Sequence, residues 1–262
     1  MEPNPVRWIS ELRRSHDELA QLVTSLTYAQ LRAGSACTDW SVSQVLSHLG
    51  SGAELALMTL QAALAGGEPP IRETSVSVWG RWNGMSPEEQ ASGFLEWDTR
   101  HLEALEGLSQ DILAHLKVRI SFLPEPVDSV GLVGLRLGEH ELHNWDIRVS
   151  FDPGATIADS AAELLVDRLP MMMPWIGHGD ALVKPPARLA VSTIAPPRRW
   201  TLELGQQVAL SEPAPGSDGS LEARGESLLR LVTGRIRPDD AARVALTGPI
   251  GLADLARVFP GF

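Results

Sequence analysis

Residues 134–150 read GLRLGEHELHNWDIRVS, and their polar side chains recur at helical spacing. Spacings of three, four and three residues predict that four polar side chains share one face of a helix: Arg136, Glu139, His143 and Asp146. Glu139 and His143 are one turn apart, so both can ligate a single metal ion. Arg136 and Asp146 lie just beyond them as candidate partners of the ligands. A solvated helix face with two ion pairs would give the same pattern.

Working outward, three further amphipathic segments precede this one. Apolar residues recur at threes and fours with charges between them, as in helices that bury one face. The second segment opens with Ser41-x-x-Gln44, which has the form of a capping box. The expected helices cover residues 6–26, 42–65, 87–117 and 127–149. Four long helices indicate a bundle.

His48 lies on the second expected helix, beside its apolar face. A histidine in that position is either packed in the core or used as a ligand. If the second and fourth helices face each other across the bundle, His48 joins Glu139 and His143. Two imidazoles and one carboxylate form the open site of a catalytic zinc ion. The pair His140 and His143 is an alternative, but it leaves Glu139 without a role.

The pattern changes after residues 151–154, which break any helix. Short apolar segments of strand length follow, together with shorter helices. The expected strands cover residues 188–193, 200–204, 207–210, 221–224 and 243–247, and the expected helices cover 158–172, 225–231 and 251–259. We therefore expect an α+β two-domain protein, with a helical bundle in residues 1–152 and a small α+β domain in residues 153–262.

The composition narrows the possible partners. The chain has 262 residues, a formal charge of −11 and a single cysteine, Cys37. Net negative charge disfavours nucleic acid, and one cysteine excludes an intramolecular disulfide. No window approaches the roughly 20 apolar residues of a membrane helix, and the charged N-terminus is unlike a signal peptide. We expect a cytoplasmic protein, and the scarcity of lysine is typical of a GC-rich bacterial genome.

Two segments resemble the signatures of a known family. CTDWSVSQVLSHL (37–49) and RLGEHELHNWDIR (136–148) resemble those of the mycothiol-dependent maleylpyruvate isomerases, a branch of the DinB-like four-helix metal proteins. RRWTLEL (198–204), GESLLRLVTGR (225–235) and GLADLARVF (251–259) resemble the family's C-terminal domain, which is similar to sterol carrier proteins. The resemblance places the metal ligands on His48, Glu139 and His143. Thr38-Asp39 replaces the family's usual Pro-Gly, which affects the turn and not the ligands.

The resemblance implies an enzyme that uses a divalent metal, with zinc expected, and the low-molecular-weight thiol mycothiol. It also implies an actinobacterial source. The thiol would add to a double bond conjugated to a carbonyl, giving cis–trans isomerisation of an unsaturated keto acid such as maleylpyruvate. A mycothiol S-transferase on the same metal is one alternative. A non-catalytic ligand-binding or regulatory metal protein is another, and it requires a fourth protein ligand, for which His16 and His140 are candidates.

An anionic keto acid requires cationic side chains near the metal, and arginine suits carboxylate binding. We expect this role for Arg81, in a polar segment before the third helix, and for Arg235, which could reach the substrate from the second domain. A surface arginine is the alternative for each. Trp79 and Trp82 either line the pocket or pack in the interior. Cys37 has no basic neighbour in the sequence, so we expect it to be structural.

Overall fold

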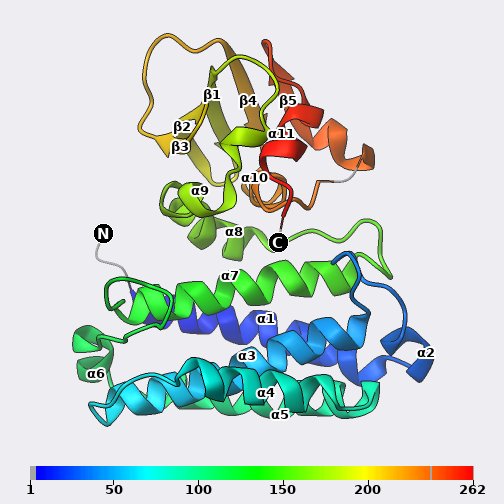
Figure 1. Cartoon of the computed structure of the whole chain (residues 1–262), viewed down its shortest axis with the longest axis vertical. Coiled ribbons are helices and arrows are strands. Elements are labelled where there is room, and N and C mark those ends of the chain that lie inside the picture. Colours follow the sequence, from blue (N-terminus) through cyan, green and yellow to red (C-terminus); the bar gives the residue numbers. More distant parts are fainter. Residues whose placement is uncertain (1–3, 237, 262) are drawn as a thin grey trace. The chain divides into compact units, whose positions relative to one another are not determined.

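The computed structural model describes residues 4–236 and 238–261 (Figure 1). The chain divides into two compact units, the first ending at Ala155 and the second beginning at Thr156. The first unit is helical, and the second contains a β-sheet with helices. The expected two-domain α+β fold is therefore confirmed.

Four long helices make the bundle of the first unit. They are α1 (Pro5–Ser25), α3 (Val42–Leu64), α5 (Pro87–Glu106) and α7 (Ser129–Arg148). These helices lie side by side in Figure 1, where α3 packs on α5 and α1 packs on α7. Fully buried side chains such as Leu19, Leu46 and Phe94 form the core between them. Among the described residues, none of the helices combines the length and apolar character required to cross a membrane.

Side-chain caps fix where the two helices with candidate ligands begin. The amide of Gln44 donates to Ser41 Oγ, and the amide of Ser41 donates to Gln44 Oε1 at 2.8 Å, so the expected capping box at the start of α3 is confirmed. At the start of α7, the amide of Gly131 donates to Asp128 Oδ1 at 2.7 Å. These caps satisfy backbone donors that a helix terminus otherwise leaves unpaired.

The third expected helix is wrong in its extent. α5 ends at Glu106, and a separate helix, α6 (Gln110–His115), begins after a new cap, in which the Ile112 amide donates to Ser109 Oγ. The polar segment before α5, for which the sequence pattern indicated no helix, also forms one, α4 (Arg72–Asn83). A short helix, α2 (Tyr28–Leu31), connects α1 to α3.

The second unit is built on one mixed sheet. Its strands are β1 (Ala187–Ile194), β2 (Pro197–Leu204), β3 (Val208–Ser211), β4 (Gly219–Ala223) and β5 (Val244–Thr247). Their order is β3-β2-β1-β4-β5, with β1 and β4 parallel and the other pairs antiparallel. Every expected strand is present in the structure.

The helices of the second unit also agree with those expected from the sequence, except that one of them is divided. They are α8 (Asp159–Leu165), α9 (Leu169–Ile176), α10 (Gly225–Val232) and α11 (Leu252–Val258). α10 packs on β1 and on α8. The expected helix 158–172 is divided by a 3-10 turn, Val166–Arg168, between α8 and α9.

Candidate metal site

Three side chains from α3 and α7 converge in the bundle. His48 Nε2 lies 3.0 Å from Glu139 Oε2, and His143 Nε2 lies 3.8 Å from the same oxygen. The His48 and His143 rings meet edge to face, with centroids 4.8 Å apart. One ligand atom from each of the three residues lies within 4.8 Å of the other two. The sequence predicted this convergence from helical spacing and bundle packing.

This donor set fits a divalent ion. Ligand atoms about 2.0–2.1 Å from a tetrahedral zinc ion are about 3.3 Å from one another. The separations of 3.0 and 3.8 Å lie on either side of that value. Two imidazoles and a carboxylate are also the donor types of open zinc sites. The residues present therefore fit the metal that the sequence led us to expect.

Asp146 orients the imidazole of His143. His143 Nδ1 lies 2.9 Å from Asp146 Oδ2, one helical turn further along α7. If Nδ1 carries the proton and donates it to this carboxylate, the Nε2 lone pair faces Glu139. Burial lowers the pKa of His143, and the bond to Asp146 opposes that effect only in part. His143 is therefore neutral at pH 7, as a metal ligand must be.

Glu139 is ionised under the same conditions. Desolvation by itself would raise its pKa, but the bond from His48 and the electrostatic interactions with His143 and His48 outweigh it and lower the pKa to about 2. The Glu139 side chain is nevertheless 51% exposed, against 38% for His48 and 11% for His143. The cluster therefore has one side open to solvent, where a small molecule can approach.

Trp40 lines the cluster, a role that the sequence analysis missed. Its ring centroid lies 5.3 Å from that of His48 and 6.3 Å from that of His143, stacked on the latter. The preceding residue, Asp39, has a φ of 68°, in the left-handed region that favours glycine. The position of Trp40 immediately before the cap Ser41 was the available signal.

Arg136 lies near enough to the cluster for its charge to help lower the pKa of Glu139, but among the described residues its side chain forms no hydrogen bond to a ligand. Its Nη2 donates to Asp98 Oδ1 at 2.5 Å and to the Leu49 carbonyl oxygen at 2.9 Å. The candidates for a fourth ligand, His16 and His140, are also hydrogen-bonded to Asp98. The pairing of His140 with His143 is likewise not formed, since His140 Nε2 faces the Asp98 carboxylate.

The two arginines expected to bind substrate lie in different units. Arg81 is on α4, half-exposed, and donates to the buried carboxylate of Glu54. Arg235 follows α10 in the second unit, where its Nη1 donates to the Thr233 carbonyl oxygen at 3.0 Å. Trp82 is fully buried, and its Nε1 also donates to Glu54, so this indole is part of the interior.

Cys37 has neighbours that its sequence context did not reveal. One nitrogen of His143, one carboxylate oxygen of Asp146 and the Cys37 sulfur lie within 4.8 Å of one another. The loop before α3 is held in place because the amide of Ala36 donates to the Asp146 carbonyl oxygen at 3.1 Å. The thiol therefore lies on the Asp146 side of His143.

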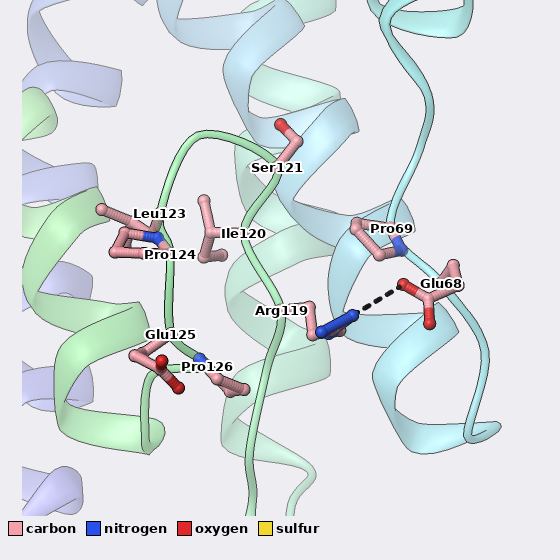
Figure 2. Close-up of a pocket in the computed structure, with 9 residues that line it drawn as sticks. All are labelled: Glu68, Pro69, Arg119, Ile120, Ser121, Leu123, Pro124, Glu125 and Pro126. Atoms are coloured by element: carbon pink, nitrogen blue, oxygen red, sulfur yellow. Dashed lines mark ion pairs between the residues drawn. The ribbon is translucent and has the colours of Figure 1, made fainter.

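A separate pocket lies at the other end of α3. Figure 2 shows its walls, in which Arg119 pairs with Glu68 at 3.7 Å beside Pro69, while Leu123 and Pro124 line the opposite side. Its volume is about 190 Å³. The rise of about 1.5 Å per residue places Leu64, the last residue of α3, about 24 Å from the level of His48. This pocket is thus remote from the His–Glu–His cluster.

These features define a class of two-domain proteins. The first domain is a helical bundle with a His–Glu–His cluster suited to binding a metal ion, and the second is an α+β domain. A family model described as the mycothiol maleylpyruvate isomerase N-terminal domain matches residues 12–148, more than half of the chain. The chain belongs to this mycothiol maleylpyruvate isomerase family. The matched residues contain all three members of the cluster.

Solved structures show the same fold. A crystal structure of the mycothiol-dependent maleylpyruvate isomerase aligns with a TM-score of 0.69 and 14% identity, covering 95% of this chain and 96% of that one. A histidine-to-alanine mutant of that enzyme aligns with a TM-score of 0.68 and 15% identity over the same shares of the two chains. The comparison with curated proteins gave no match.

Proposed function

We propose that His48, Glu139 and His143 hold one divalent ion, with zinc expected. The observation that carries this proposal is the convergence of their three donor atoms on the half-exposed side of the bundle. The neutral state of His143 and the ionised state of Glu139 support it, because metal ligands must be deprotonated. His16 and His140, the candidates for a fourth ligand, are bonded to Asp98, which favours an open site over a closed structural one.

We further propose that the chain is an isomerase that uses a low-molecular-weight thiol, with mycothiol as cosubstrate and an unsaturated keto acid such as maleylpyruvate as substrate. Membership of the family supports this reaction class. A divalent ion in the site would stabilise the thiolate and so promote deprotonation of the thiol. Sulfur then adds to the double bond conjugated to the keto group, the resulting single bond rotates, and elimination releases the trans isomer with the thiol unchanged.

The residues of the chain contribute position and charge to this reaction. Trp40 covers one side of both imidazoles and restricts the directions from which a ligand can approach. Arg81 and Arg235 are proposed to bind the substrate carboxylates. For Arg81, a substrate carboxylate would compete with Glu54 for the guanidinium. No protein nucleophile is required, so Cys37 keeps its structural role in this proposal.

Metal content tests the ligand assignment. Purified wild-type protein is expected to hold about one divalent ion per chain, and His48→Ala and His143→Ala are expected to lose it. His115→Ala is the matched control, because His115 is a strongly exposed histidine on α6. Retention of the metal by folded His48→Ala and His143→Ala proteins would show that other residues hold the ion.

The reaction is tested separately with the metal-loaded protein. Turnover of maleylpyruvate is expected only when mycothiol is added, and Cys37→Ser is expected to keep most of the activity. A trans product with the thiol recovered supports the isomerase. A stable thioether would identify an S-transferase on the same site. Turnover without a thiol would contradict both and point to a metal-bound hydroxide.

A further inference from the structure

Asp98 lies outside the candidate metal site, on α5, and its carboxylate binds side chains from two other helices. His16 Nδ1, on α1, lies 2.7 Å from Asp98 Oδ2. His140 Nε2, on α7, lies 3.1 Å from the same oxygen, and Arg136 Nη2, also on α7, donates to Oδ1 at 2.5 Å. All four side chains are buried, so water does not compete for these bonds.

Arg136 extends this network to α3. Its Nη2 also donates to the Leu49 carbonyl oxygen at 2.9 Å. A Cβ atom placed on Gly52 would lie 3.1 Å from Arg136 Nη1, so the α3 backbone closely approaches the guanidinium. Through this one side chain, the Asp98 carboxylate connects all four long helices of the bundle.

The carboxylate is charged in its buried position. Desolvation by itself would raise the pKa of Asp98, but the Arg136 charge and the bonds from His140 and His16 hold it well below its ordinary value. Its bonds are therefore charge-assisted, which makes them strong and directional. Loss of this charge would leave Arg136 as a buried cation without its partner.

This cluster is not a second metal site. His16, Asp98 and His140 each place one ligand atom within 4.8 Å of the other two, as metal ligands do. However, Asp98 contributes a single negative charge, which Arg136 already balances. A divalent cation there would add two positive charges beside a buried guanidinium. Hydrogen bonding accounts for the same atoms without that cost.

We propose that Asp98 is a positioning residue that sets the axial register of α3 against α7, and with it the approach of His48 to Glu139. The inference rests on the proposed metal site. Apolar side chains tolerate small sliding between helices, whereas a buried hydrogen-bonded network has one best position. Leu49 directly follows His48, and His140 directly follows Glu139, so a displacement at the network passes to the ligands. A slip of one residue moves a side chain by about 1.5 Å.

The full-length Asp98→Asn protein tests this role with Co²⁺ as the probe, because its visible spectrum reports coordination geometry. We expect Co²⁺ to bind at least about tenfold more weakly than in the wild type, with an altered spectrum. The matched control is Glu141→Gln, which neutralises another buried carboxylate of the bundle, one bonded to Arg14 of α1 and not to α3. We expect the control to keep the wild-type spectrum and affinity even where it lowers stability.

A double variant covers the case in which Asp98→Asn does not fold, and crystals of the metal-free variant test the helix register directly. If Asp98→Asn alone does not fold, Asp98→Asn/Arg136→Met removes both charges, and the same loss of affinity is expected. In metal-free crystals, the separation of 3.0 Å between His48 Nε2 and Glu139 Oε2 is expected to exceed hydrogen-bonding distance in the variant. Wild-type spectrum, affinity and separation in a folded variant would overturn the positioning role. A wild-type protein that binds no Co²⁺ would overturn the metal proposal instead, and the crystals would still decide the register.

Discussion

At the scale of single residues, the two ring nitrogens of His143 have different roles. Nδ1 faces the Asp146 carboxylate at 2.9 Å, while Nε2 faces Glu139. A carboxylate on the far nitrogen fixes the tautomer and raises the basicity of the ligating nitrogen. The cluster therefore depends on a residue that does not belong to the proposed ligand set.

Asp146→Asn is expected to weaken binding of the divalent ion by about 10- to 100-fold, because the amide can present its N–H group to Nδ1 and stabilise the wrong tautomer. Competition with a chromophoric chelator measures the affinity. Asp111→Asn, at a strongly exposed aspartate on α6, serves as the control and is expected to bind like the wild type. An unchanged affinity in Asp146→Asn would show that the bond to His143 does not tune the site.

His101 makes the stability of the bundle dependent on pH. It is fully buried, and among the described residues neither of its ring nitrogens has a hydrogen-bond partner. Burial, with the nearby Arg136 charge, lowers its pKa from 6.5 to about 3. Between these values the unfolded chain binds a proton at this residue and the folded chain does not. Stability is therefore lost as the pH falls through this window, by up to about 1.4 kcal/mol per pH unit.

His101→Phe is expected to remove that contribution. Urea unfolding is measured at several pH values between about 6.5 and 4.5. The free energy of unfolding of the variant should depend less steeply on pH than that of the wild type, by the equivalent of up to one proton taken up on unfolding. Asp98, whose pKa lies well below its ordinary value, does not change charge in the folded state in this window. Equal slopes for the two proteins would mean that His101 is protonated in the folded state.

At the scale of elements, the predictable features were those with a local signal. The caps and periodicity of α3 and α7 were readable in the sequence, and so was the face that carries Glu139 and His143. The helix α4 could not be predicted from the sequence, because Arg72–Asn83 buries only Val78 and Trp82 and has a weak apolar pattern. The role of Asp98 was equally hidden, since it depends on how α5 is rotated within the bundle. Arg136 was placed on the correct face, but its long side chain bonds to α5 and α3.

Trp82 explains where α4 docks. Its ring lies against Gly50 of α3 and Gly93 of α5, where added Cβ atoms would come within 2.2 and 2.9 Å of ring carbons. Gly50→Ala is therefore expected to destabilise the protein by about 1–3 kcal/mol, because the buried indole must shift. The free energy of unfolding in urea measures this cost.

Gly80→Ala is the matched control for that substitution. Gly80 is also a helical glycine, on α4, but a Cβ atom there would meet nothing within 4 Å. Alanine is the better helix former, so a gain of about 0.5–1 kcal/mol is expected. If the two substitutions changed stability equally, the close contact of Trp82 with Gly50 would not be a determinant of packing.

At the scale of the whole molecule, each unit has its own core and its own chemistry. The three proposed ligands all lie in residues 4–155, whereas Arg235 and a buried Arg230–Glu226–Asp240 network lie in the second unit. The sequence predicted both units because periodicity changes from helical to strand-like near residue 154. It did not predict the internal ion-pair network of the second unit. Glu226 and Arg230 are one turn apart on α10, but Asp240 joins them only because the Pro238–Arg243 segment folds back against this helix.

The location of the ligands predicts which part of the molecule responds to the metal. When a ligand binds only the folded state and its free concentration is about 100 times its Kd, it stabilises that state by about 2.7 kcal/mol. Because all three proposed ligands belong to α3 and α7, zinc is expected to slow amide hydrogen exchange in those helices and to leave β1–β5 unchanged. Exchange measured by mass spectrometry on the full chain, with and without zinc, tests this. His48→Ala should show no protection in either unit. Protection that extended to the Arg235 segment would mean that the second unit also responds to the ion, and the ligand set would then need a residue from that unit.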